Sequence, residues 1–120
     1  MARLVHVPWY ATVFRGDRLQ DALAEIAPVA LRYDATAYEV HRAREDRYRF
    51  LQTAAFDDQV AWERYWYGPE FIEWRARYTS CYQVPVVYGW HDLVTAGSFT
   101  PGNGGANGEA TSASSVPSGT

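Results

Sequence analysis

The sequence has one cysteine, no long apolar run and no cluster of basic residues, and each gap argues against a class of protein. Cys81 is the single cysteine, so an internal disulfide is impossible, and a lone thiol fits a reducing compartment such as the cytoplasm. No apolar run reaches the roughly 20 residues that span a bilayer, and the N-terminus lacks a signal-peptide apolar region, so we expect no membrane partner. The 11 Lys and Arg residues form no basic run beside 14 acidic residues, which argues against nucleic acid as a partner.

Motifs of several enzyme classes are also missing. The three histidines, His6, His41 and His91, form no pair at metal-binding spacing, and no cysteine lies beside them, so we expect no metal site. Cys81 lies outside any nucleophile motif and is expected to be a small core residue. The glycine-rich stretch 102–108 precedes no helix and is therefore no phosphate-binding loop.

The composition changes near residue 95. From 95 to 120 the sequence is almost wholly Gly, Ser, Thr, Ala, Asn and Pro, with Phe99 and Val116 as the sizeable apolar residues. Such a segment buries too little surface to offset its ordering entropy, which predicts a disordered tail. Its function could be that of a tether or a targeting peptide. Residues 1–94 then form one globular domain, which contains all 5 Trp and all 9 Tyr of the chain.

Within this domain, alternation and helical spacing predict the order strand, helix, strand, strand, helix, strand. The predicted strands cover residues 4–14, 35–43, 47–55 and 80–94. Pro8 and Pro85 imply a bulge or an edge position in the first and the last of these strands. Asp17 and Gln20 match a capping box at the start of the first helix, and Pro28 should kink or end that helix.

The second helical region contains the densest group of aromatic residues. In the stretch 62–74, WERYWYGPEFIEW, Trp62 and Trp66 are four residues apart and therefore share one helix face. Proline is tolerated in the first turn of a helix but breaks its interior, so Pro69 predicts two short helices and opens the second. An Asp of the pair 57–58 is expected to cap the first.

This element order predicts an α+β, ferredoxin-like βαββαβ sandwich with a four-stranded antiparallel sheet and both helices on one face. The sheet face without helices is expected to carry large residues as well. In the last predicted strand, Tyr88 and Trp90 would lie on this face and Val87 on the other. A small sheet that is apolar on both faces usually hides the second face in a partner, which predicts a homodimer through the sheet faces. Because the first and last strands are neighbours in this fold, His6 should lie near His91 or Asp92.

The chain resembles the dimeric α/β-barrel superfamily, and most closely the antibiotic biosynthesis monooxygenase-type domains. The resemblance covers residues 4–94 and rests on the element order and on four short runs: Phe50-Leu51-Gln52, Phe56-Asp57-Asp58, Trp62-Glu63-Arg64-Tyr65 and Val84-Pro85-Val86-Val87-Tyr88. It implies that two sheets face each other in a dimer. It also implies a hydrophobic cavity between each sheet and its helices.

Members of this superfamily differ in activity, and many have none known. Some oxidise phenolic or quinol polyketides with molecular oxygen and neither metal nor flavin, which implies that no cofactor is needed. Others degrade haem with an Asn, a Trp and a haem-ligating His. Residues 1–94 contain no Asn and the second aromatic helix no His, so we do not expect haem degradation.

Cofactor-free oxidation of a small aromatic substrate requires an apolar cavity, a proton acceptor and donors that stabilise an anion. The candidate lining residues are Trp62, Tyr65, Trp66, Tyr67 and Trp74. The candidate polar and catalytic residues are His6, Tyr10, Tyr38, His41, Arg75 and Tyr88. The alternative is a non-catalytic ligand-binding or assembly protein, because aromatic residues at helical spacing are often core. A cavity with converging polar groups would favour the enzyme, and a layer filled by the rings themselves would favour the alternative.

Overall fold

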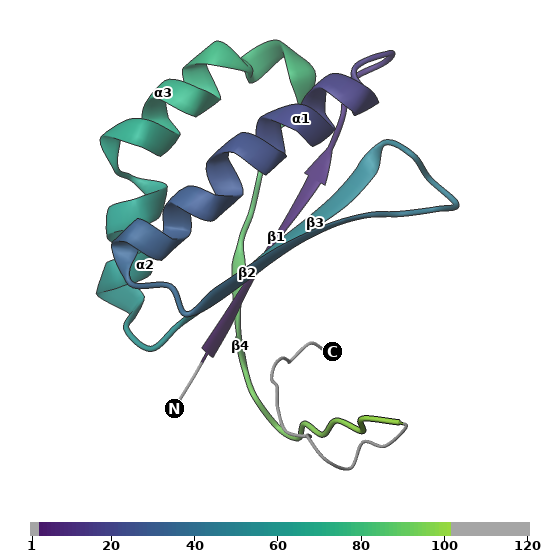
Figure 1. Cartoon of the computed structure of the whole chain (residues 1–120). Helices are drawn as coiled ribbons and strands as arrows, with labels where there is room; N and C mark the ends of the chain where they lie inside the picture. The colour runs from purple at the N-terminus through teal and green to yellow at the C-terminus, as the bar shows by residue number, and fades with distance from the viewer. Residues whose placement is uncertain (1–2, 102–120) are drawn as a thin grey trace.

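The structure is a computed structural model that describes residues 3–101 and has a sheet layer and a helix layer (Figure 1). The strands are β1 (Arg3–Tyr10), β2 (Ala37–Arg42), β3 (Arg49–Phe56) and β4 (Gly89–Asp92). The helices are α1 (Gly16–Ile26), α2 (Gln59–Trp66) and α3 (Pro69–Arg77), with short 3₁₀ helices η1 (Ala27–Tyr33) and η2 (Thr79–Cys81). The antiparallel sheet has the order β2-β3-β1-β4, so the predicted ferredoxin-like α+β fold is confirmed.

β1 is paired unequally on its two sides. It pairs with β3 along its whole length, from Arg3 opposite Phe56 to Tyr10 opposite Arg49, without a bulge. Its pairing with β4 covers only Arg3 to His6. Pro8 therefore lies where β1 has a neighbour on one side alone, which is the edge position that a proline without an N–H tolerates.

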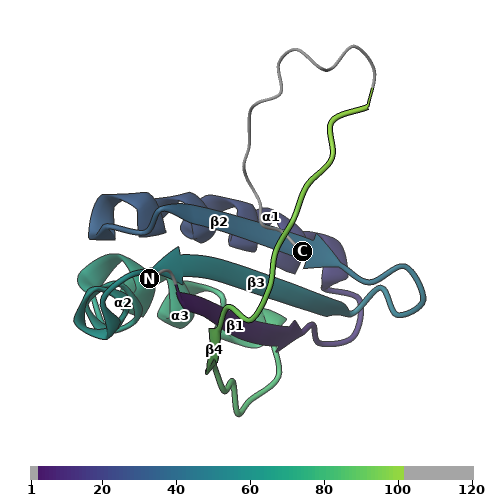
Figure 2. The ribbon, with the colours of Figure 1, turned by 90° about the horizontal axis from the view of Figure 1, so that it is seen from below.

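The alternation of side chains separates two faces of the sheet. Val5, Val7 and Trp9 of β1 are at most 1% exposed and face the helices. The other face, called the open face below, carries no helix between residues 3 and 101. Figure 2 shows β2 in front of α1, with β3 and β1 beside it. The register places on it Leu4, His6, Pro8 and Tyr10 of β1, Ala37, Glu39 and His41 of β2, Arg49, Leu51, Thr53 and Ala55 of β3, and Gly89 and His91 of β4.

The prediction for the last strand was wrong in two respects: the strand is shorter than expected, and its large side chains are on the other face of the sheet. Tyr82 forms only an isolated bridge to Ala11, and regular pairing begins again at Gly89. Pro85 in between has no N–H to donate to a ladder, which explains the interruption. Trp90 pairs with Val5 and belongs to the helix side, where Tyr88 also packs, so neither residue contributes to the open face as predicted.

The first helix follows the prediction at its end but not at its start. It ends at Ile26, two residues before Pro28, as expected. Its N-cap is Arg15, with no side-chain cap, so the predicted capping box is wrong. The Asp17 carboxylate and the Gln20 amide oxygen instead each accept a hydrogen bond of 2.8 Å from Arg42, at the end of β2. The charged guanidinium of Arg42 is a stronger donor than a backbone N–H, so it binds the two side chains that would otherwise cap the helix.

The aromatic helices begin as predicted. The carboxylate of Asp58 accepts a 2.9 Å hydrogen bond from the backbone N–H of Val60 and caps α2. Pro69 is the first residue of α3, which gives the predicted break between the two helices.

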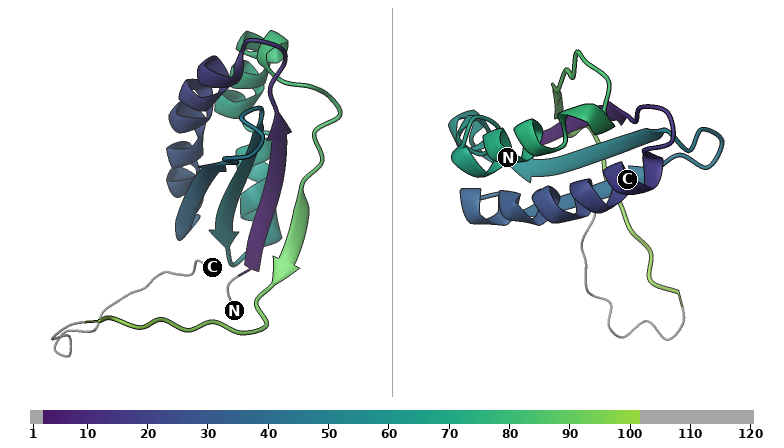
Figure 3. Two further views of the ribbon diagram at one scale, coloured as in Figure 1. Left: turned by 90° about the vertical axis from the view of Figure 1, so that its right-hand side faces the viewer. Right: turned by 90° about the horizontal axis from the view of Figure 1, so that it is seen from above.

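β4 is followed by an extended segment, residues 93–101, called the arm below. Every residue from His91 to Pro101 is exposed. Figure 3 shows the arm leaving the end of β4 and projecting away from the sandwich. The rest of the predicted tail, 102–120, lies outside the described residues, and the domain boundary at 94 stays a prediction. Between residues 3 and 101, no helix is long and apolar enough to cross a membrane.

Candidate active site

Aromatic rings fill the layer between the sheet and the helices. Trp62, Tyr65 and Trp74, three of the predicted lining residues, are at most 2% exposed. Their rings pack on one another and on Trp9 and Phe71, most of them edge to face, with centroids 4.9–5.6 Å apart. All three belong to the core of the domain, and the Trp62 ring also borders the group described below.

The polar groups inside this layer are paired with one another. Trp9 Nε1 donates to Gln52 Oε1 at 3.0 Å, and Gln52 Nε2 donates to the Tyr65 hydroxyl at 3.2 Å. The Tyr65 hydroxyl in turn donates to the Ile26 carbonyl at 2.7 Å. Burial raises the pKa of Tyr65 far above its ordinary value, so it stays a protonated donor. Because these groups are satisfied, this part of the layer has a structural role.

A different arrangement occurs where α2 ends against the segment before β4. There Trp62, Trp66, Tyr67, Arg75 and Tyr88 form a group called the Trp66 cluster below. The Tyr88 ring meets Trp62 and Trp66 edge to face, at 5.1 and 5.4 Å between centroids. The Arg75 guanidinium lies 4.4 Å from the Trp66 centroid and donates to the Trp66 carbonyl at 2.8 Å. Two predicted polar residues, Arg75 and Tyr88, are thus brought together with two predicted lining residues.

The Trp66 cluster contains buried donors without acceptors. Trp62 Nε1 and Arg75 Nη1 are both inaccessible to solvent and have no hydrogen-bond partner. Tyr88 is close to the Trp62 N–H, but the geometry falls short of a hydrogen bond. Trp90 Nε1, on the same side of the sheet, is a third such donor. Most buried donors in proteins are paired, so an unpaired group requires an explanation.

The titratable members of the cluster act as a cation and as neutral donors. Burial raises the pKa of Tyr88, with further contributions from its neighbours, so its hydroxyl is protonated near neutral pH. Burial lowers the pKa of Arg75, but guanidinium starts so high that it keeps its charge. Tyr67 is 61% exposed at the helix end and is near enough to affect the pKa values of both residues. The cluster therefore offers positive charge and N–H or O–H donors to a ligand.

The other predicted polar residues lie elsewhere. His6, Tyr10 and His41 are on the open face, separated from the Trp66 cluster by the sheet. The predicted approach of His6 to His91 is confirmed, with ring centroids 4.0 Å apart. His41 contacts the Glu39 carboxylate at 2.8 Å. Tyr38 is on the outer strand β2, 36% exposed.

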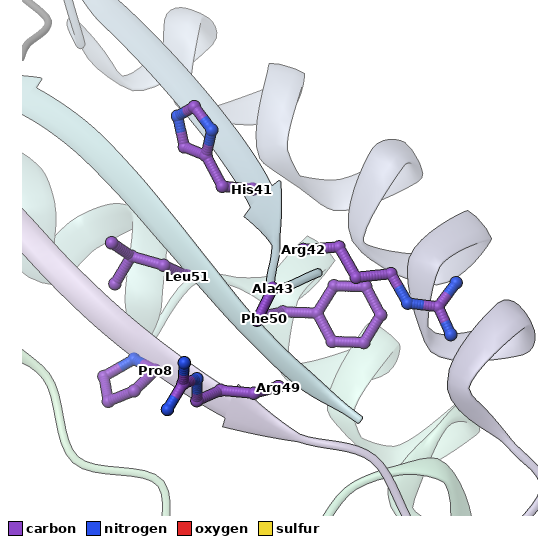
Figure 4. Close-up of a pocket in the computed structure, with 7 residues that line it drawn as sticks. All are labelled: Pro8, His41, Arg42, Ala43, Arg49, Phe50 and Leu51. Atoms are coloured by element: carbon purple, nitrogen blue, oxygen red, sulfur yellow. The ribbon is translucent and has the colours of Figure 1, made fainter. Parts of the chain in front are cut away.

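The open face also contains a hollow that the sequence did not predict. It has a volume of about 310 Å³ and is lined by Pro8, His41, Arg42, Ala43, Arg49, Phe50 and Leu51 (Figure 4). Figure 4 shows Arg49 beside Pro8, while Phe50 points to the opposite side of the sheet. Its residues come from three strands and from Ala43, just after β2, so no local pattern could have indicated it. Within residues 3–101, no group of three or more His, Cys, Asp or Glu side chains could hold a metal ion.

Comparison with known proteins identifies the fold. No family model and no curated protein matches the sequence. A candidate antibiotic biosynthesis monooxygenase from Nitrosomonas europaea matches with a TM-score of 0.70 and 12% identity over 80% of this chain and 94% of that one. One from Bordetella bronchiseptica matches with a TM-score of 0.69 and 16% identity over 78% and 98%.

A variant of SnoaB, a cofactor-independent oxygenase from Streptomyces nogalater, matches with a TM-score of 0.66 and 14% identity over 78% of this chain and 95% of that one. At such identities the likeness establishes the fold alone. The chain therefore has the ferredoxin-like fold seen in antibiotic biosynthesis monooxygenase-type proteins, as the sequence resemblance implied.

Proposed function

We propose that the protein is a cofactor-independent monooxygenase for a small aromatic, polyketide-like substrate that binds at the Trp66 cluster. The observation that carries this proposal is the pair of buried donors without acceptors, Trp62 Nε1 and Arg75 Nη1. Leaving a buried donor unpaired costs roughly 1–3 kcal/mol, a cost that a ligand oxygen could remove. The likeness in fold to SnoaB supports the reaction class.

The chemistry follows from what these groups can stabilise. A phenol or enol becomes electron-rich enough to reduce dioxygen once it is ionised. Arg75 and the Trp62 N–H would stabilise that anion, and the rings of Trp66 and Tyr88 would pack against its aromatic system. In such a substrate, a CH₂ group conjugated to the ionised phenol or enol reacts with dioxygen, and its carbon becomes a carbonyl. One oxygen atom of O₂ enters the product, the other leaves as water, and the substrate supplies all the electrons.

The proton has no histidine acceptor in the cluster, since His6, His41 and His91 all lie on the open face. We therefore infer that the site binds the substrate as its anion, stabilised by the guanidinium, rather than removing the proton with a general base. An Arg charge beside a bound phenol lowers the pKa of that phenol. Tyr88, as a neutral donor, would complete the anion site.

The test is oxygen consumption with a hydroxylated anthrone as the probe, followed by absorbance of the quinone product. We expect turnover by the parent protein and a loss on the order of 100-fold for Arg75→Gln, as for other donors that stabilise an anion. Arg77→Gln is the matched control, because Arg77 is on the same helix but pairs with Glu25 and Glu73 on the surface. Equal rates for the two variants would contradict the proposal.

A second candidate is a non-catalytic protein that binds a small ligand or acts in assembly. It is favoured by the rings of Trp62, Tyr65 and Trp74, which occupy the layer where a large cavity was expected. Trp66→Phe separates the two roles of that ring. If Trp66 is only core, the change should cost about 1–3 kcal/mol of stability and leave anthrone binding unchanged. Anthrone binding without oxygen consumption would favour the binding protein.

We further propose that the protein forms a homodimer through the open face. Leu4 and Tyr10 on this face are 36% and 44% exposed, and two such sheets can pack face to face. An interface of this kind should exceed roughly 1,000 Å². A monomer by light scattering at micromolar concentration would contradict it. Cys81, a buried free thiol, fits the reducing cytoplasm that the sequence predicts.

A further inference from the structure

Phe14 lies in the loop between β1 and α1, and two properties set it apart from the rest of the surface. Its side chain is 93% exposed. Its backbone is in the left-handed region, with a φ of 66°, which a bulky residue rarely adopts and which glycine would adopt without strain. Neither the packing nor the backbone of the domain therefore favours phenylalanine here. A residue that is unfavourable for the fold in two ways is a candidate for contact with another molecule.

Two further large side chains lie beside Phe14. Val13, its neighbour in the loop, is 65% exposed. Tyr48, in the connection between β2 and β3, is 39% exposed, and its hydroxyl accepts a 3.5 Å hydrogen bond from the Phe14 N–H. Figures 1 and 2 show the loop after β1 and the β2–β3 connection at the same end of the sheet. Residues 12–18 and 42–48 together are called the Phe14 tip below.

The Phe14 tip is basic, although the chain as a whole is acidic. It contains five of the 11 basic residues but only three of the 14 acidic residues. Of these acidic residues, Asp17 is paired with Arg42, and Asp46 accepts a 3.1 Å hydrogen bond from the Tyr48 N–H. Within residues 3–101, the four other arginines of the tip are exposed and have no carboxylate partner: Arg15, Arg18, Arg44 and Arg47. An apolar point among such cations favours an anionic partner.

We propose that the Phe14 tip is a peripheral membrane-binding site that inserts Phe14 and Val13 into the interface of an anionic lipid bilayer. Aromatic side chains are favoured at the level of the lipid headgroups, and arginines bind lipid phosphates. A bilayer accepts a projecting apolar loop without a matching pocket, whereas a protein partner would have to provide one. This inference is independent of the proposed monooxygenase activity.

Peripheral binding of this kind requires no membrane-spanning segment. The expectation of no membrane partner rested on the lack of a long apolar run, which a loop at the lipid surface does not need. One arginine near an anionic surface raises the partition coefficient about fivefold, and burial of one phenyl ring raises it roughly 10-fold or more. The Phe14 tip should therefore bind reversibly, and the contribution of its charges should fall as the salt concentration rises.

The experiment is sedimentation of the full-length protein with lipid vesicles. One set of vesicles contains equal parts of phosphatidylglycerol and phosphatidylcholine, and the other contains phosphatidylcholine alone. We expect binding to the anionic vesicles, much weaker binding to the neutral ones, and a loss of binding at high salt. Equal binding to the two sets, or no binding to the anionic set, would overturn the proposal.

Phe14→Gly separates contact with the membrane from support of the fold. It should lower the partition coefficient about 10-fold without lowering the melting temperature, because glycine fits a left-handed backbone. Phe14→Leu, which keeps an apolar side chain, should retain most of the binding. Phe99→Ala is the matched control, since Phe99 is 85% exposed in the arm, and it should leave binding unchanged. Equal partition coefficients for the parent and Phe14→Gly would contradict insertion.

The role of the arginines is tested by Arg44→Gln, which should lower binding to the anionic vesicles about fivefold. Arg64→Gln is its control, because it changes the net charge equally at a residue outside the tip that pairs with Asp34. Equal losses for the two variants would mean that net charge alone governs binding and would overturn the assignment to the tip. Binding of heparin that depends on Phe14 as strongly as vesicle binding does would assign the tip to a soluble polyanion instead.

Insertion itself can be followed with an environment-sensitive dye on Phe14→Cys in a Cys81→Ala background. The emission of the dye should shift to shorter wavelength when anionic vesicles are added, because the tip enters a less polar medium. The same dye on Phe99→Cys should show no such shift. An unchanged emission from the dye at position 14, with the protein bound to the vesicles, would overturn the proposal.

Discussion

The two faces of the sheet are built from alternate residues of the same strands, yet they differ in almost every property. On the helix side of β3, Phe50, Gln52 and Phe56 are at most 1% exposed. Phe50 lies under the Arg42 guanidinium, Gln52 accepts a hydrogen bond from Trp9, and Phe56 packs on Trp62. On the open face of the same strand, Arg49 is exposed and Leu51 is half-buried. Period-two alternation therefore divides one strand into a side that holds the fold together and a side that is free to contact other molecules.

The contrast also holds for polar groups. The buried polar chain from Trp9 through Gln52 and Tyr65 to Ile26 is complete, which makes this part of the core rigid and specific. The Trp66 cluster lies on the same side of the sheet but retains unpaired donors. Completeness of pairing thus separates core from candidate site better than burial does, since the unpaired donor atoms Trp62 Nε1 and Arg75 Nη1 are themselves buried.

The largest expected effect is on the helix side. Trp74→Ala should cost about 3–5 kcal/mol, because it removes a ring that is 2% exposed and leaves the Ala22 carbonyl without its 2.7 Å hydrogen bond. The measurement is the free energy of unfolding in urea. Leu51→Ala on the open face should cost about 1 kcal/mol or less in the monomer.

The same pair of variants also tests whether a second copy covers the open face. A loss at Leu51 that grows with protein concentration would indicate that a second copy covers the open face. Equal losses for Trp74→Ala and Leu51→Ala at low concentration would mean that the two faces contribute alike to the fold, contrary to the structure.

An intermediate effect is expected from Gln52→Leu. The change leaves the indole N–H of Trp9, which is fully buried, without an acceptor and should cost about 1–3 kcal/mol. Thr53→Ala is the matched control, one residue along β3 on the opposite face, and should cost less than about 1 kcal/mol. Melting temperatures of both variants test this, and an equal or larger shift for Thr53→Ala would refute the role given to the buried chain.

The smallest expected effect is a pH dependence on the open face. Burial and the neighbouring His91 lower the pKa of His6 from its ordinary value of 6.5. The unfolded chain then binds a proton more readily than the folded one, so this contribution to stability is intact above about pH 6.5 and is lost as the pH falls toward the folded-state pKa. The loss should be below about 1 kcal/mol, because the ring is partly solvated.

Unfolding free energies of the parent and of His6→Gln between pH 7.5 and pH 5 provide the measurement. The open face near His6 holds His91 on β4 and Thr53 on β3, so His91 is the titratable group that faces His6 from the neighbouring strands. The difference between parent and variant should shrink or change sign as the pH falls. A constant difference across the range would exclude His6 as the source.

The fold was largely predictable because its main signals are local. The break at Pro69 and the cap at Asp58 depend on the chemistry of a few consecutive residues. The errors came from partners distant in sequence. Asp17 and Gln20 match a capping box, but Arg42, more than 20 residues away, binds both side chains. Nothing in a local pattern distinguishes a carboxylate that caps its own helix from one that pairs with a strand.

The candidate site was predictable only in part. The spacing of Trp62 and Trp66 indicated one helix face, and Arg75 and Tyr88 were expected as polar partners. The sequence could not show that Trp62 and Trp66 would meet Tyr88 while Tyr65 joined the core, because this depends on which ring finds a hydrogen-bond partner across the layer. The hollow was missed altogether, since it results from the packing of three strands.

The contacts among the tryptophans have a consequence for the optical properties of the molecule. Trp9, Trp62, Trp66 and Trp74 form a connected series, with neighbouring ring centroids 5.3–6.1 Å apart. Indoles this close exchange excitation energy, so their fluorescence reports the state of the whole series rather than that of single residues. An aromatic ligand that quenches Trp66 should therefore also reduce the emission that originates at Trp74, which is connected to Trp66 through Trp9. The domain carries its own label-free reporter.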